Sequence, residues 1–500
     1  MEAFQQLLNE ISAILWGPYT LIPLLLGTGV YLTIRLNLIQ VRKFWSAFRL
    51  AFFDKSDEES TGGDISQFQA LATALAATVG VGNIVGIASV IHFGGPGAIF
   101  WMWVTGLVGM ASKYSEAFLG VRFRTVDEAG ECSGGPQYYL SKGIPNRFGS
   151  FLAIAFSVFA AIAAFGIGNM VQGNAIAVNL KDALNIPLPL TGVILALLVG
   201  LVLIGGISAI GRVTSLLVPF MVLAYVVSCL IIIGLHGAAL PGVLEMIFAD
   251  AFTGTGIMGG FGGATMLLAL QYGVARSLAS NESGMGSGGI AAAAARTAHP
   301  VRQGMVSMTQ TFIDTLIVLT CTSLVLLTTG VWTEKIDPGI MTNTAFNDAL
   351  PGGFGHWIVI VGIVLYAFST ILGWAYYGER CMERLAGRRA VRPYRLAWCV
   401  VVFVGATIPL ETAWALMDVM NSLMVLPNLI GLIVLAPLVV RETRHYLAND
   451  PYLQASVDEI GVFMAGEPGH IDDTDALASL AHIKEPHAAV EGHDEDGSSP

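Results

Sequence analysis

A series of long apolar segments, separated by short polar loops, most constrains how this chain can fold. Hydrophobic residues make up 54% of the 500 residues and charged residues only 12%, where a typical soluble domain has about 25% charged residues. A soluble chain of this length could not bury so much apolar surface. Because about 20 apolar residues suffice to cross a bilayer, the sequence predicts an all-α membrane protein with many spans.

Eleven segments are long and apolar enough to be predicted as membrane spans. They are residues 13–35, 67–92, 96–121, 150–178, 190–207, 213–235, 261–279, 303–330, 356–378, 396–411 and 413–440. Only a tight polar break at Pro409 and Glu411 separates the last two. Segment 37–55 is basic and aromatic, which favours an amphipathic helix at the membrane surface over a further span.

Positive charge is distributed unevenly between the predicted loops. If the N-terminus lies outside, nearly all arginines and lysines fall in inner loops, and the outer loops hold only Lys181 and Lys335. Because loops rich in positive charge stay on the cytoplasmic side, the sequence predicts an outer N-terminus and a cytoplasmic C-terminus in a prokaryotic inner membrane. Residues 441–500 are predicted to form a solvated cytoplasmic tail, acidic toward its end.

Eleven spans divide into one N-terminal span and two sets of five. Residues 1–65 hold the N-terminal span and the surface helix, and residues 66–235 hold the first set. An extracellular loop, 236–260, precedes the second set at 261–440. Because five is odd, the two sets start on opposite sides of the membrane, which is the arrangement of inverted repeats in secondary transporters.

The second span contains a motif that should interrupt its helix. Residues 76–83 are Ala-Ala-Thr-Val-Gly-Val-Gly-Asn, and glycine costs about 1 kcal/mol relative to alanine inside a helix. An unwound turn exposes N–H and C=O groups that need partners in lipid, and a carboxylate and a cation can satisfy them. A small-residue packing seam is the alternative, but Thr78 and Asn83 favour a binding site. Gly273 in the seventh span occupies a comparable position.

Four motifs together resemble the alanine/glycine:cation symporter family. They are residues 78–84 (TVGVGNI), 280–287 (SNESGMGS), 312–315 (FIDT) and 373–380 (GWAYYGER). The first motif also resembles the unwound first core helix of sodium symporters with the leucine-transporter fold. The resemblance covers most of residues 66–440 and implies that fold, with one extra N-terminal helix before a 5+5 inverted-repeat core. It further implies a symporter that couples inward sodium or proton flow to uptake of alanine, glycine and serine by alternating access.

The resemblance implies roles for individual residues. Backbone amides of Gly80, Val81 and Gly82 would hold the substrate carboxylate, with Thr78 beside them. The oxygen ligands implied for one sodium come from Ala76, Val79, Tyr366, Ser369 and Thr370. The last three lie at helical spacings i, i+3 and i+4, so they share one helix face. A second sodium is implied near Thr78 and Asn83.

Polar and aromatic residues elsewhere in the spans extend the candidate site. Gln172, with Asn169 or Asn174, is predicted either to bind polar groups of the substrate or to hydrogen-bond neighbouring helices. The resemblance makes Gly273 part of a second broken helix that faces the first across the site. Large aromatic side chains, which usually serve packing, are predicted to enclose a small apolar side chain: Trp374, Phe261 and Tyr376.

Asp314 is a carboxylate inside the eighth predicted span, where a charge is costly and usually functional. We expect it to orient Thr315, to pair with Arg276 or to carry a proton. Lys113 and Glu116 lie three residues apart near a span end, which favours a local ion pair.

Other classes of function lack their sequence signatures. The chain contains neither H-E-x-x-H nor G-x-S-x-G, and no nucleotide-binding G-x-x-x-x-G-K-[ST], so an ion gradient must supply the energy. Its five cysteines are scattered and predict neither a disulfide framework nor a zinc site. We expect a monomer without enzyme activity, resident cofactor or nucleic-acid partner. A proton-coupled transporter of another small carboxylate is the alternative, and a membrane-embedded enzyme a weaker one.

Overall fold

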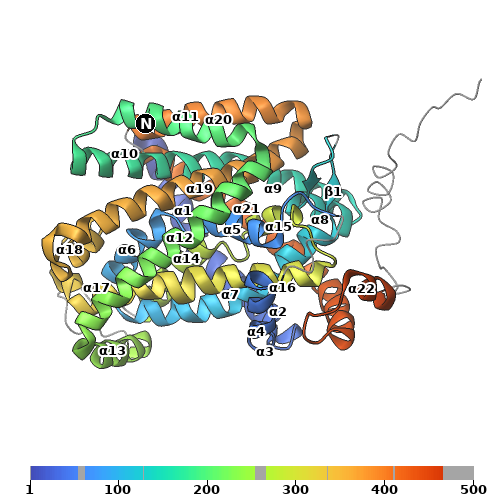
Figure 1. The fold of residues 1–500 in the computed structure, drawn as a ribbon, viewed down its shortest axis with the longest axis horizontal. Helices are drawn as coiled ribbons and strands as arrows, with labels where there is room; N and C mark the ends of the chain where they lie inside the picture. The colour runs from blue at the N-terminus through green and yellow to red at the C-terminus, as the bar shows by residue number, and fades with distance from the viewer. Residues whose placement is uncertain are drawn as a thin grey trace, which may run out of the picture.

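The fold is a bundle of long helices. The computed structural model describes residues 2–17, 19–54, 62–127, 129–253, 266–334, 336–408 and 411–464. Figure 1 shows α11 (Leu188–Ile204) beside α20 (Val391–Thr407) at one edge, and α7 (Gly97–Arg122) beside α16 (Pro300–Thr311) toward the other. Within the described residues, six helical segments are long and apolar enough to cross a membrane. The chain is therefore a multi-pass membrane protein, and the count of eleven spans stays a prediction.

The N-terminal part differs from the predicted span at 13–35. It comprises α1 (Glu2–Leu15), α2 (Leu21–Arg35), α3 (Ile39–Arg42) and α4 (Phe44–Phe52). The helix breaks between α1 and α2, where the Thr20 hydroxyl donates to the Leu15 carbonyl at 2.7 Å. The short helices α3 and α4 lie where an amphipathic surface helix was predicted.

The first predicted set of five spans contains the expected broken helix. Its elements are α5 (Gln67–Thr78), η2 (Val81–Asn83), α6 (Gly86–Gly94), α7, β1 (Thr125–Val126), β2 (Cys132–Ser133), α8 (Pro136–Gly143), α9 (Arg147–Phe165), η3 (Gly166–Met170), α10 (Val171–Leu184), α11 and α12 (Gly206–Leu235). Ser66 and Gln69 cap the start of α5 by reciprocal hydrogen bonds between side chain and backbone. The helix ends at Thr78 and resumes at Gly86, so the interruption predicted from the glycine motif is confirmed.

The second set begins after a segment that is partly helical. The elements are η4 (Gly237–Ala239), α13 (Leu240–Thr253), α14 (Met266–Asn281), α15 (Ser287–Ala293), α16, η5 (Phe312–Leu319), α17 (Thr320–Thr329), η6 (Val331–Thr333), α18 (Pro338–Ala349), η7 (Pro351–Gly353), α19 (Phe354–Ala386), η8 (Arg388–Ala390), α20, α21 (Glu411–Asn449) and α22 (Val457–Met464). The predicted loop 236–260 therefore contains the helix α13.

The helix break predicted at Gly273 is wrong, because α14 continues through that residue. Gly273 serves close packing instead: a Cβ there would lie 2.3 Å from the Ala98 carbonyl oxygen on α7. The interruption lies at residues 282–286, between α14 and α15. There Gly284 and Gly286 have φ angles of +88° and +94°, a conformation that glycine adopts without strain.

A network of charged side chains joins the β1–β2 hairpin to the end of α19 and the start of α20. It comprises Asp127, Glu131, Glu379, Arg380, Glu383, Arg388 and Arg395. Arg380, whose side chain is only 1% exposed, lies 2.7 Å from Glu379, 2.9 Å from Glu383 and 2.9 Å from Glu131. Although burial raises the pKa of Asp127, backbone amides and Arg388 hold it below its usual value. The network fixes the hairpin to α19.

The buried charge of Arg380 yields a stability prediction. Replacement of Arg380 by Gln should lower the free energy of unfolding by about 3–5 kcal/mol, because the four carboxylates around it would then share only Arg388 and Arg395. Thermal unfolding of the purified protein in detergent measures the change. The matched control is Arg389→Gln, since Arg389 is exposed and surface changes usually stay within about 0.5 kcal/mol. Equal melting temperatures for both variants would contradict the prediction.

Candidate functional site

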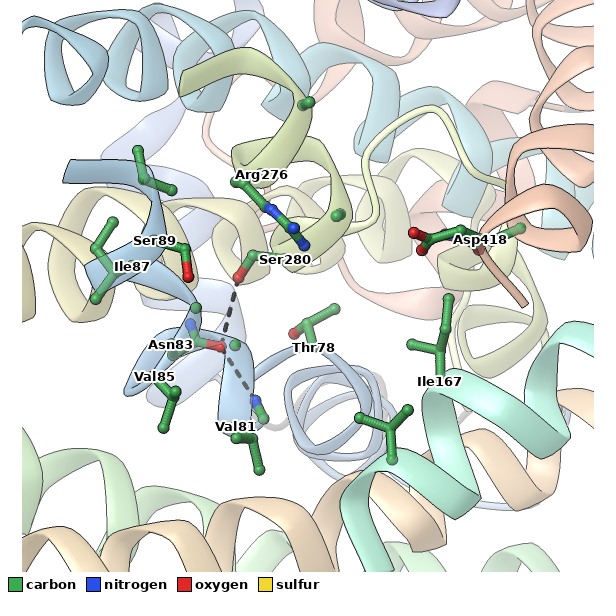
Figure 2. A pocket seen from close by; sticks show the side chains of 18 of the residues that line it. Thr78, Val81, Asn83, Val85, Ile87, Ser89, Ile167, Arg276, Ser280 and Asp418 are labelled. Carbon is green, nitrogen blue, oxygen red and sulfur yellow. Dashed lines mark hydrogen bonds between the residues drawn. The ribbon is translucent and has the colours of Figure 1, made fainter. Parts of the chain in front are cut away.

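A cavity of about 660 Å³ lies beside the break in the first helix. Ligand sites commonly occupy about 300–1,000 Å³. Figure 2 shows side chains from α5, η2, α6, α14 and α21 around this space, with Arg276 and Asp418 on different sides. Its polar and aromatic lining includes Thr78, Asn83, Gln172, Arg276, Ser280, Glu282, Thr370, Trp374, Asp418 and Asn421.

Side chains pair several backbone groups of the unwound turn. The Gly80 amide donates to the Asn83 side-chain oxygen at 3.1 Å, and the Val81 amide donates to Gln172 Oε1 at 3.4 Å. On the far side of the turn, the Asn83 carbonyl accepts from Thr322 at 3.0 Å. These contacts satisfy backbone polar groups that would otherwise be unpaired at membrane depth.

The structure distinguishes Gln172 from the two asparagines near it. Asn169 donates to the Trp398 carbonyl at 3.0 Å and Asn174 to the Gly405 carbonyl at 3.1 Å, so both connect to α20. Gln172 lines the cavity and donates to the Ile167 carbonyl at 3.0 Å, within the π-helical turn η3. Turns of this kind often occur at functional sites.

Four of the five residues predicted for one sodium converge where α19 meets the end of α5. Thr370 Oγ1 lies 2.9 Å from the Ala76 carbonyl oxygen and 3.0 Å from that of Tyr366. Ser369 Oγ lies 2.8 Å from the Tyr366 carbonyl oxygen. The fifth residue, Val79, is fully buried at the end of α5. The cluster offers neutral oxygen atoms, which are suitable ligands for a hard cation.

Asp314 lies fully buried in a second π-helical turn, η5, and receives three hydrogen bonds. Its carboxylate accepts from Asn83 Nδ2 at 2.6 Å, from Ser280 Oγ at 3.0 Å and from Thr315 Oγ1 at 3.0 Å. Contact with Thr315, pairing with Arg276 and proton binding were the three roles expected for Asp314. The structure contains the contact with Thr315. Arg276 and Asp418 both line the cavity.

The remaining predicted residues occupy different environments. Thr78 Oγ1 accepts from Gln310 Nε2 at 3.1 Å, so its partners differ from those of Asn83. Trp374 is buried and lines the cavity, whereas the described lining includes neither Gly273 nor Tyr376. Phe261 lies outside the described residues.

The sequence analysis missed Ser280, Asp418 and Gln310. Asp418 carries the signal that had singled out Asp314, a carboxylate within a predicted span. Ser280 opens one of the four motifs, and the buried amide of Gln310 in the eighth span was a further signal of the same kind.

Lys113 and Glu116 form the predicted pair, with 3.9 Å between charged atoms and both side chains fully buried. The pair also contacts the second helix break. Lys113 Nζ donates to the Glu282 carbonyl at 3.1 Å, and Glu116 Oε1 accepts from the Gly286 amide at 2.8 Å.

Comparison with known proteins identifies the family. Residues 1–458 match the profile described as the sodium:alanine symporter family. The sodium/alanine symporter AgcS of Methanococcus maripaludis is 46% identical over 89% of this chain and 97% of its own length. An uncharacterized transporter of Haemophilus influenzae is 47% identical over 91% and 99%, and the probable sodium/glutamine symporter GlnT of Bacillus subtilis 33% identical over 88% and 91%. This chain belongs to the sodium:alanine symporter family.

Proposed function

We propose that the protein is a secondary active symporter that couples inward sodium flow to uptake of alanine, glycine and serine. The observation that carries the proposal is the break in the first core helix between a cavity and a cluster of buried oxygen atoms. A broken helix presents amides to an anion and carbonyls to a cation. One structural element can therefore bind an amino acid and sodium together.

The substrate carboxylate binds the amides of Gly80, Val81 and Gly82 in this proposal. The first two amides have side-chain partners, Asn83 and Gln172, which substrate binding displaces. Gln172 remains beside the turn as a polar contact, and Trp374 limits the size of the side chain.

The first sodium binds the oxygens of Ala76, Val79, Tyr366, Ser369 and Thr370. These oxygens connect the first broken helix to α19, so an ion there would hold the two helices together. For a second cation, the contacts favour Asn83, Ser280 and Asp314 over the pair of Thr78 and Asn83, because Thr78 faces Gln310.

We further propose the 5+5 inverted-repeat architecture, with the domain limits given above and the N-terminus outside. In support, the first helix of each set is broken, at residues 79–85 and at 282–286. The cavity includes residues of α1 and α6, whose ends are predicted to lie outside. We therefore assign this conformation as outward-facing.

Proton coupling is a second candidate, and one observation favours it. Asp314 is buried beside cavity-lining residues, and in the described part of the chain no cationic side chain lies within 4 Å of its carboxylate. A proton bound to Asp314 would neutralise its carboxylate, as a sodium ion at this position would. In this hypothesis, an acidic exterior replaces sodium in driving uptake.

The sodium ligands give the principal test of the function. In proteoliposomes, alanine uptake should require an inward sodium gradient. The double change Ser369→Ala and Thr370→Ala should raise the sodium concentration for half-maximal uptake by about tenfold or more, because it removes two ligand oxygens. The control is Ser323→Ala, whose buried hydroxyl bonds only within its own helix, at 2.7 Å from the Leu319 carbonyl oxygen. An unchanged sodium requirement in the double variant would exclude this site.

Gly80 has no room for a side chain. A Cβ there would lie 2.9 Å from Thr370 Oγ1 and 3.4 Å from Gln172 Oε1, whereas Gly82 has no atom within 4 Å of such a Cβ. Gly80→Ala should therefore weaken equilibrium alanine binding at least tenfold, measured with labelled alanine in detergent. The control is Gly234→Ala, because a Cβ at Gly234 would have no neighbouring atom within 4 Å. If Gly80→Ala bound alanine normally, the assignment of this turn would be wrong.

Trp374 should determine which side chains fit. Alanine, glycine and serine should compete for uptake, whereas leucine and phenylalanine should compete poorly, and Trp374→Ala should admit leucine. Apolar contact contributes only about 1–3 kcal/mol per methylene, so rejection of larger residues depends on the steric wall. Trp357→Ala changes a half-exposed tryptophan of the same helix and serves as the control. Leucine competing as well as alanine in the unmodified protein would refute the small-substrate hypothesis.

A further inference from the structure

One face of α16 carries a line of buried polar side chains that leads away from the candidate site. Gln303, Ser307 and Gln310 follow at spacings of four and three residues, and Asp314 continues the line four residues later. These spacings place all four on one helix face. The three in α16 are 0%, 6% and 0% exposed, and Asp314 is fully buried. At about 1.5 Å per residue, the line is about 16 Å long.

The line starts at the proposed second cation site and follows α5 toward its first residue. Gln310 donates to Thr78 near the end of α5 at 3.1 Å, and Asp314 accepts from Asn83 in η2 at 2.6 Å. Near the other end of the line, Gln67 at the start of α5 donates to Thr297 at 3.0 Å. The start of α5 and the start of α16 are predicted to lie on the cytoplasmic side.

Two side-chain oxygens in this line lack partners. Gln303 Oε1 and Gln310 Oε1 are buried without a hydrogen bond from any described residue. Gln303 does use its amide nitrogen, which lies 3.2 Å from Ser307 Oγ. Leaving a buried acceptor unpaired is energetically costly, so these oxygens are suited to a cation or to water that accompanies it.

The arginine next to Gln303 is already paired. Arg302 precedes Gln303, lies 3.6 Å from Asp450 and donates to the Ala455 carbonyl at 3.1 Å. A cation leaving along Gln303 therefore does not meet an unpaired arginine on α16.

We propose that this face of α16 is the exit path of the coupling cation, from Asp314 past Gln310, Ser307 and Gln303 to the cytoplasm. The inference rests on the proposed sodium symport and adds the inner route of the ion. In the present conformation the path is closed. The backbone bridge from Ile65 to Ala295, and the hydrogen bond from the Arg296 amide to the Ile65 carbonyl at 2.7 Å, hold the start of α5 in place. Release requires α5 to move away from α16.

The competing explanation is that these residues only join helices by hydrogen bonds, as polar residues in membrane proteins often do. Helix-joining residues stay buried throughout transport and affect stability. A path instead becomes wet in the inward-facing state, and its oxygen atoms affect the rate of ion release.

Thiol labelling distinguishes these explanations. The five native cysteines are first replaced by serine or alanine, and Ser307→Cys is then introduced. Inside-out membrane vesicles are treated with aminoethyl methanethiosulfonate, a small cationic reagent. Ser307→Cys should react at least about tenfold faster than Met308→Cys, which is also buried but points about 100° away around the helix. Sodium should slow the reaction, because it holds α5 against α19. Equal rates at the two positions would overturn the proposal.

Transport by Gln303 variants gives an independent readout. Gln303→Met removes the unpartnered oxygen and should lower the maximal uptake rate at least about fivefold while the alanine Kd stays unchanged. Gln303→Glu keeps a side-chain oxygen and should restore most of the rate. A parallel loss of binding and thermal stability, without rescue by glutamate, would support the helix-joining role. The labelling experiment requires no substrate. It can therefore show that the exit path is wrong even when the unmodified protein takes up alanine with sodium, so the two proposals fail in different experiments.

Discussion

The requirement that every backbone polar group find a partner inside the bilayer governs the centre of this protein. The first core helix stops at Thr78 and resumes at Gly86. Three of the groups freed between these residues are held by side chains from other parts of the chain: Gln172 on α10, Thr322 on α17 and Thr342 on α18. Four segments together therefore hold the broken helix. A ligand that enters the turn exchanges some of these partners for its own.

The interruption at Gly80 was predictable because glycines, a threonine and an asparagine lie together in an apolar run. The second interruption was misplaced for a physical reason. Gly273 lies within a continuous helix, where the absence of a side chain lets α7 approach closely. A single glycine in a sequence therefore does not distinguish close helix packing from an unwound turn. The better signal was the motif at 280–287, where two glycines adopt positive φ angles. That motif also carries part of the family resemblance.

Side-chain partners were harder to predict than helix positions. The clustering of Ala76, Tyr366, Ser369 and Thr370 followed from the resemblance and from helical spacing. Asp314, in contrast, contacts Asn83 across 231 residues of sequence, a distance over which spacing rules carry no information. Arg276 shares the cavity with Asp418, a carboxylate whose place there the spacing along the sequence does not indicate. Tertiary packing decides such pairs, since several polar residues compete for each buried charge.

The two π-helical turns affect how the sequence can vary. Each turn contains more residues than an α-helical turn, and Gln172 and Asp314 follow or occupy these wide turns. Loss of one residue within η3 would return the helix to regular α geometry, and the residues after it would keep nearly the same direction, because a π turn holds about one residue more than an α turn. Gln172 would then lose the widened turn in which the Ile167 carbonyl accepts from its side chain. In these two helices the extra residue is therefore part of the candidate site, and a one-residue deletion there would alter the site while leaving the rest of the helix in place.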